Sequence, residues 1–151
     1  MREVGKTGLV LSLAMALLVF TRFGSSSYVA SDTKPNGEAI AHHIALLRSG
    51  KPQQKAAAAY WLGQQHSAAA VDPLVELLGD VSEINPMQYR AKRVLQKLTL
   101  GEEVAAALVN IGHPAIEPLI RVLKTSPVPV ARRNAAWALG ALHDTGATSE
   151  I

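Results

Sequence analysis

Two stretches of almost the same pattern constrain the fold of this chain more than any other feature. Ala70–Leu78 reads AVDPLVELL and Ala115–Leu123 reads AIEPLIRVL. Each follows an alanine-rich segment that ends in an apolar residue and a glycine, at Leu62–Gly63 and at Ile111–Gly112, and a third such segment is Asn134–Gly140. An internal repeat of this kind predicts stacked helix pairs, because one pair alone cannot bury its apolar face.

Apolar spacing and the prolines predict the individual helices. Proline lacks an amide hydrogen and is tolerated in the first turn of a helix, so the two repeated stretches become helical within about three residues upstream of Pro73 and Pro118. Apolar residues at spacings of three and four predict the other helices. These helices cover Glu38–Arg48, Gln53–Gln64, Glu102–Ile111 and Val130–Leu142.

The N-terminus is typical of a targeting segment. Arg2 and Lys6 precede the apolar run Gly8–Phe20, which is shorter than the roughly 20 residues that span a bilayer. Residues 1–31 therefore predict a cleaved signal peptide, with an uncleaved membrane anchor or a buried apolar helix as alternatives. The positive residues before the run favour export of the rest of the chain, so we expect a periplasmic or membrane-anchored protein that faces outside the cytoplasm.

Residues 32–37 are polar and turn-prone, and predict a linker before a repeat domain at 38–151. An insertion at about 80–100 interrupts the repeat, and the spacing of Val94, Leu95 and Leu98 predicts one inserted amphipathic helix over Met87–Leu98.

The last repeat, 128–151, is incomplete, because its first helix has no partner stretch. Ala135, Leu139 and Leu142 are then expected to present an apolar side. This apolar side would be covered by a partner, by a second copy of the chain through self-association, or by a further part of the protein if the chain is truncated.

The repeated pattern resembles HEAT-like repeats of the short bacterial, phycobilisome lyase-like type. It consists of an alanine-rich helix, an apolar residue plus glycine, and a next helix that starts with alanine, an aliphatic residue, any residue, proline and leucine. The resemblance covers about Ile40 to His143, and Arg132 and Arg133 resemble the arginine that opens a first helix in this family. It implies an all-α fold, a short right-handed α-solenoid of stacked antiparallel helix pairs. It also implies that the second helices line a concave surface, which hosts many binding roles.

Composition and charge exclude several classes of function. The chain has no cysteine, which excludes disulfides, thiolate metal sites and a cysteine nucleophile. The formal net charge is +3, but Arg2, Lys6 and Arg22 against Glu3 supply two of these units. The remainder is close to neutral, so we expect no nucleic-acid partner.

No motif predicts catalysis, a cofactor or a metal. His42 and His43 are adjacent and point about 100° apart on a helix, so they do not grip one metal together. No nucleophile motif or phosphate-binding glycine loop is present. The neighbouring acids Glu102 and Glu103 are interpreted as complementing a helix dipole at its N-terminus.

Two sets of charged residues are the candidates for partner contact. Arg90, Arg93 and Lys97 fall on one side of the predicted inserted helix, where they would face an acidic partner or lipid headgroups. Glu76 and Arg121 occupy equivalent positions in the two repeated stretches, and stacking would bring them together on the concave surface.

These observations predict a non-catalytic protein-protein interaction scaffold of the cell envelope, whose partner is another protein. A membrane contact is expected only through an uncleaved N-terminal segment. Two alternatives remain: a lyase-like enzyme or enzyme subunit that handles a tetrapyrrole, which the family resemblance implies, and a cytoplasmic HEAT-like nucleic-acid binder, which requires that the N-terminus is not an export signal.

Overall fold

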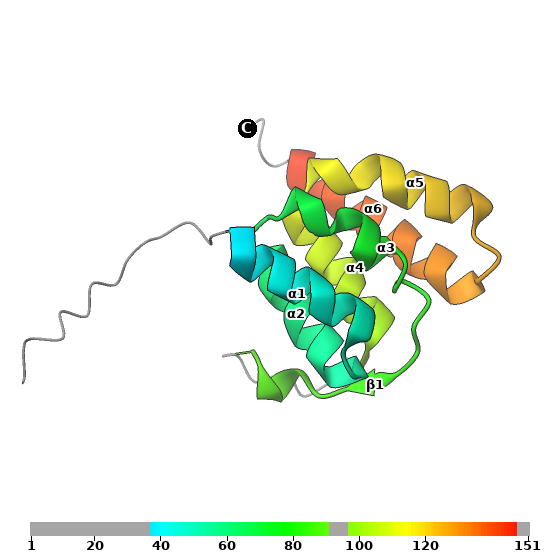
Figure 1. Ribbon diagram of the computed structural model, residues 1–151. Coiled ribbons are helices and arrows are strands. Elements are labelled where there is room, and N and C mark those ends of the chain that lie inside the picture. Colours follow the sequence, from blue (N-terminus) through cyan, green and yellow to red (C-terminus); the bar gives the residue numbers. More distant parts are fainter. Residues whose placement is uncertain (1–36, 91–96, 148–151) are drawn as a thin grey trace, which may run out of the picture. The chain divides into compact units, whose positions relative to one another are not determined.

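The computed structural model describes residues 37–90 and 97–147 (Figure 1). The chain divides into the units Met1–Thr33 and Lys34–Ile151, and the described residues all belong to the second unit. The predicted signal peptide or anchor and the linker lie outside the described residues, apart from Gly37. Within the described ranges, no helix combines the length and apolar character needed to cross a membrane.

The described part of the chain is mostly helical, and its helices pack in pairs (Figure 1). The predicted all-α fold of paired helices is confirmed. The central helix α4 lies between α2 and α6, while α1 packs on α2 and α5 packs on α6. The helices are α1 (Gly37–Ser49), α2 (Pro52–Gln64), α3 (Val71–Val75), α4 (Leu100–Ile111), α5 (Ile116–Thr125) and α6 (Pro129–Ala147).

Local signals set the helix starts. The α-helices α3 and α5 begin two residues before Pro73 and Pro118, as expected, and each is preceded by a short 3-10 turn, η1 (Ala68–Ala70) or η3 (His113–Ala115). Helix α4 begins at Leu100 because Thr99 and Glu102 form a capping box: the Glu102 amide donates to Thr99 Oγ1 (3.3 Å) and the Thr99 amide donates to Glu102 Oε2 (2.9 Å).

Small side chains bring α2 and α4 together. A Cβ atom added at Gly63 would lie 2.9 Å from the Cα of Ala107, so only glycine permits this approach. Ala56, Ala59 and Leu62 on the same helix are fully buried. Glycine at position 63 and alanine at position 107 therefore let the first two repeats approach closely.

Helix α3 is shorter than the sequence predicts. The repeated stretch should be helical to Leu78, but α-helix ends at Val75. From there the backbone tightens: the Leu77 amide bonds to Leu74 O (2.9 Å) and the Leu78 amide to Val75 O (3.3 Å). The Leu78 carbonyl is left to accept a hydrogen bond from Asn134 Nδ2 of α6 at 2.8 Å. A contact with a distant helix thus replaces the last helical turn.

The predicted inserted helix over Met87–Leu98 is wrong at both of its ends. Pro86–Gln88 forms a 3-10 turn, η2, where the Met87 amide donates to Asn85 Oδ1 (3.1 Å). Leu98–Thr99 forms strand β2, which pairs antiparallel with β1 (Glu83–Ile84). Residues 91–96 lie outside the described part. The two chain ends of the insertion are tied by strand pairing instead of by helical hydrogen bonds.

The predicted apolar side of the last repeat is only partly correct. Ala135 is fully buried, because α6 packs against both α4 and α5, and Leu139 and Leu142 are half-buried against the same core. The large apolar side chain that α6 does expose is Trp137, at 57%. The accessible surface of this helix therefore centres on an aromatic residue that the prediction left out.

Equivalent glycines of two repeats provide a matched test of the α2–α4 contact. Gly63→Ala is expected to lower the free energy of unfolding by about 1 to 3 kcal/mol, because the added methyl group meets the backbone of Ala107. Gly140 follows the same Leu-Gly pattern in α6, but a Cβ atom added there would meet nothing within 4 Å. Gly140→Ala should therefore stabilise by about 0.5 to 1 kcal/mol through helix propensity. Urea unfolding of both variants measures this difference, and equal effects would contradict it.

Candidate functional site

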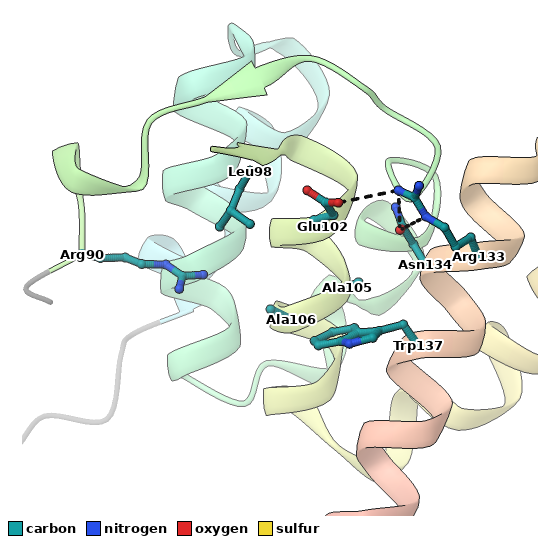
Figure 2. Close-up of a pocket in the computed structure, with 8 residues that line it drawn as sticks. All are labelled: Arg90, Leu98, Glu102, Ala105, Ala106, Arg133, Asn134 and Trp137. Carbon is teal, nitrogen blue, oxygen red and sulfur yellow. Dashed lines mark hydrogen bonds and ion pairs between the residues drawn. The ribbon is translucent and has the colours of Figure 1, made fainter. Parts of the chain in front are cut away.

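A pocket of about 440 Å³ opens on the side of α4 that faces the insertion and α6 (Figure 2). The insertion supplies one wall, α4 the floor and α6 the opposite wall. The lining residues are Arg90, Leu98, Glu102, Ala105, Ala106, Arg133, Asn134 and Trp137.

The floor of the pocket is apolar and is formed mainly by small side chains. Ala105 is buried and Ala106 is half-buried on α4, while Leu98 rises from the strand that precedes this helix. Figure 2 shows the indole of Trp137 reaching from α6 toward α4, beside Ala106. The two alanines carry only methyl groups, and the indole beside them stays 57% exposed.

Two consecutive residues of α6 define the polar edge of the pocket. Asn134 is 4% exposed and is held by its bond to the Leu78 carbonyl. The neighbouring Arg133 side chain is 63% exposed, and its guanidinium makes only long contacts: Nε and Nη2 lie 3.4 Å from Asn134 Oδ1, and Nη2 lies 3.6 Å from Glu102 Oε1. A fixed amide therefore stands beside a cation that has no short hydrogen bond in the described residues.

The other cation of the pocket has a buried counter-charge. Arg90 Nη2 donates to both carboxylate oxygens of Glu103, at 2.7 and 2.5 Å. The Glu103 side chain is 1% exposed and that of Arg90 is 23% exposed. The Arg90 guanidinium also lies 5.2 Å from the ring centre of Tyr60, which in turn lies 5.6 Å from that of Tyr89. This cluster attaches the insertion to α2 and α4.

Burial has two further effects in this cluster. The Tyr89 hydroxyl and Arg90 Nε are buried and have no hydrogen-bond partner in the described part of the chain. Burial, and next the nearby Glu103 carboxylate, raise the pKa of the Tyr89 phenol well above its usual value. Burial lowers the pKa of Arg90, but the hydrogen bond and the charge interaction with Glu103 outweigh burial, so the net pKa is raised and Arg90 stays protonated across physiological pH.

The interpretation of Glu102 and Glu103 as a simple dipole pair was incomplete. Glu102 does cap α4, but Glu103 is buried and paired with Arg90. One signal was available in the sequence: Glu103 lies four residues before Ala107, and hence on the same, buried face of the helix.

The structure does not bring the predicted contact residues together. Arg90 and Lys97 share no helix face, because Arg90 pairs with Glu103 while Lys97 pairs with Glu83 at 3.2 Å on the exposed surface. Arg93 lies outside the described residues. Glu76 and Arg121 are both exposed, as predicted, but form no ion pair with each other or with any other described residue.

Two of the described histidines, His43 and His66, make contacts that explain their positions in the fold. His43 stacks on Trp61 with ring centres 3.9 Å apart, and its Nδ1 donates to the Ala39 carbonyl at 2.8 Å. His66 Nδ1 donates to the Asn110 carbonyl. Over residues 37–90 and 97–147, no group of three or more His, Asp or Glu side chains is arranged to hold a metal ion.

Paired helices in register, with first helices α2, α4 and α6 packed side by side, define a helical repeat architecture that is consistent with HEAT-like repeats. A family model described as PBS lyase HEAT-like repeat matches residues 54–80, 102–125 and 131–151. The chain thus contains PBS lyase HEAT-like repeats at three positions, as its sequence pattern predicted. No curated protein matches the chain.

The matches place the pocket within the repeat scheme. Helix α4 opens the second matched segment and most of α6 lies in the third, whereas the insertion that carries Arg90 and Leu98 falls between the first and second segments. The pocket therefore combines side chains of the matched repeats with side chains of a segment that lies between them.

Arg90 and Glu103 should each stabilise the fold only while the other residue is present. Arg90→Met leaves a buried carboxylate without a partner, and we expect a loss of about 2 to 3 kcal/mol of unfolding free energy, below the range for a wholly buried pair because Arg90 is 23% exposed. Combining it with Glu103→Met should restore most of this loss. Chemical denaturation of the two single variants and the double variant gives the coupling energy.

Lys97→Met is the matched control, since it removes a cation from an exposed pair of the same insertion. Its effect should stay below about 0.5 kcal/mol. Losses of equal size from Lys97→Met and Arg90→Met would contradict the role given to the buried pair.

Proposed function

We propose that this protein is a non-catalytic protein-interaction scaffold whose partner binds across the pocket between the insertion, α4 and α6. The observation that carries the proposal is Trp137, a large aromatic side chain 57% exposed beside an open apolar floor. HEAT repeats in general mediate protein interactions, which supports this role for a chain that contains them.

The chemistry of the pocket favours binding over catalysis. Tryptophan and arginine are the residues that most often dominate the binding energy of protein interfaces, especially at a well-packed centre. Here an indole and the Arg133 guanidinium border one apolar floor. The other charged side chains have structural roles, since Glu102 caps α4 and Arg90 is paired with the buried Glu103.

The interaction should centre on the pocket, and site-specific photocrosslinking in cells tests this. A photoreactive phenylalanine analogue at position 137 is expected to give one discrete adduct of higher mass, because the side chain there faces the partner. The same analogue at position 121, on exposed α5, is the matched control and should give little adduct. An adduct from position 121 alone would place the partner on the exposed side of α5 instead of at the pocket.

We also propose that the repeat domain works outside the cytoplasm, as a periplasmic or membrane-anchored protein. The support is the sequence of residues 1–31, where Arg2 and Lys6 precede an apolar run. A phosphatase reporter that folds only after export, fused after Ile151, should be active. N-terminal sequencing of the mature protein then distinguishes a cleaved signal peptide from an anchor. An inactive but intact fusion would contradict export.

A further inference from the structure

We propose that the pocket recognises an extended acidic peptide in which a carboxylate side chain lies two residues from a large apolar side chain. The carboxylate would pair with Arg133 and the apolar side chain would pack between Trp137 and the alanines of α4. This inference rests on the proposed interaction function and specifies the chemistry of the partner.

Arg133 has the free binding capacity that this role requires. A guanidinium carries five N–H donors, and its charge-assisted bonds to carboxylates are usually about 2.7 to 2.9 Å long. The three contacts of Arg133 measure 3.4, 3.4 and 3.6 Å. A partner carboxylate would therefore form shorter bonds to Arg133 than the described chain supplies to this side chain.

Glu102 does not remove the attraction for an acidic partner. One of its carboxylate oxygens, Oε2, already accepts the Thr99 amide in the capping box, and the other lies 3.6 Å from Arg133. The cation is also the more accessible member of this pair, with its side chain 63% exposed against 40% for Glu102. The outer edge of the pocket next to α6 thus presents positive charge.

The spacing along α6 sets the spacing in the peptide. Arg133 and Trp137 are four residues apart and so lie on one face of the helix, separated by a rise of about 6 Å. In an extended chain, residues two apart also share a face, at a separation of about 6.6 Å. A carboxylate and an apolar side chain at that interval match the two side chains of α6.

The equivalent position of α2 shows how such a surface receives a chain segment. Tyr60 lies three residues before Gly63, as Trp137 lies three before Gly140, so the two aromatics share a repeat position. Tyr60 is covered by Tyr89 and Arg90 of the insertion. No described segment covers Trp137 in this way. A peptide of a partner would occupy at α6 the kind of place that the insertion occupies at α2.

Peptide display on the full-length chain in mild detergent tests the inference, with random nine-residue peptides as the probe. The wild-type chain should enrich Asp or Glu two positions from a large apolar residue. Trp137→Ala should weaken binding of the selected peptides at least ten-fold. Arg133→Glu should invert the charge preference and enrich Lys or Arg at that position, and Arg133→Met should abolish the preference without inverting it.

Arg121→Glu is the matched control, because it makes the same change on exposed α5 and should leave the acidic preference intact. Circular dichroism confirms that each variant is folded before it is compared. Inversion by Arg133→Glu but not by Arg121→Glu supports the inference.

The outcomes separate the two proposals. Peptides that depend on Trp137 but show no charge preference overturn the acidic inference and leave the interaction function standing. Peptides that bind independently of Trp137, or the absence of any selected peptide, overturn both. Self-association of the full chain that Trp137→Ala removes, measured by sedimentation, would assign the pocket to a second copy and also overturn the inference.

Discussion

The close contact of α2 with α4 is the constraint on which the rest of the described structure depends. Gly63 lies so near Ala107 that a single added methyl group would meet the backbone of α4. Larger side chains at this contact would separate the first two repeats and open the core that holds Leu62 and Leu108. Because α4 also packs on α6, its position decides where the third repeat lies and hence where the pocket forms.

A second constraint is a buried hydrogen bond that connects the end of the first repeat to the first helix of the third. Asn134 of α6 donates to the Leu78 carbonyl, which is free because the turn after α3 tightens. A Cβ atom at Gly101 would lie 2.5 Å from that carbonyl oxygen and 2.8 Å from Asn134 Nδ2, so glycine is needed at the start of α4. This buried hydrogen bond fixes the backbone of α6 immediately beside Arg133. Arg133 and the following turn of α6 therefore project from a part of the helix that cannot shift freely.

Sequence reasoning predicted the features that depend on local chemistry. The positions of Pro73 and Pro118 and the apolar spacing gave the helix starts to within a few residues, and the repeat pattern gave the family. The features that it missed depend on partners distant in the chain. Asn134 of α6 bonds to the end of α3 across 56 residues of sequence, and the two ends of the insertion pair with each other as short strands instead of forming a helix.

The candidate site was harder to predict than the fold for the same reason. The charge of Arg90 is evident in the sequence, but its use is decided by Glu103, a carboxylate that folding buries. The exposure of Trp137 likewise depends on which neighbouring surfaces remain uncovered, since Tyr60 at the same repeat position is covered.

The insertion adds a wall to the surface that the repeat helices form. Two hydrogen bonds between the Gln53 side chain and the Asn85 backbone, at 2.8 and 2.9 Å, hold one part of the insertion on α2, and Arg90 holds another on α4. The same segment then contributes Arg90 and Leu98 to the wall of the pocket. A change in the insertion would therefore alter what the pocket accepts while leaving the helix pairs in place, whereas a change at Gly63 would alter both. Shape and specificity thus come from different parts of this chain: the small residues of the repeats position α4 and α6, and the inserted segment decides how much of their shared face remains open to a partner.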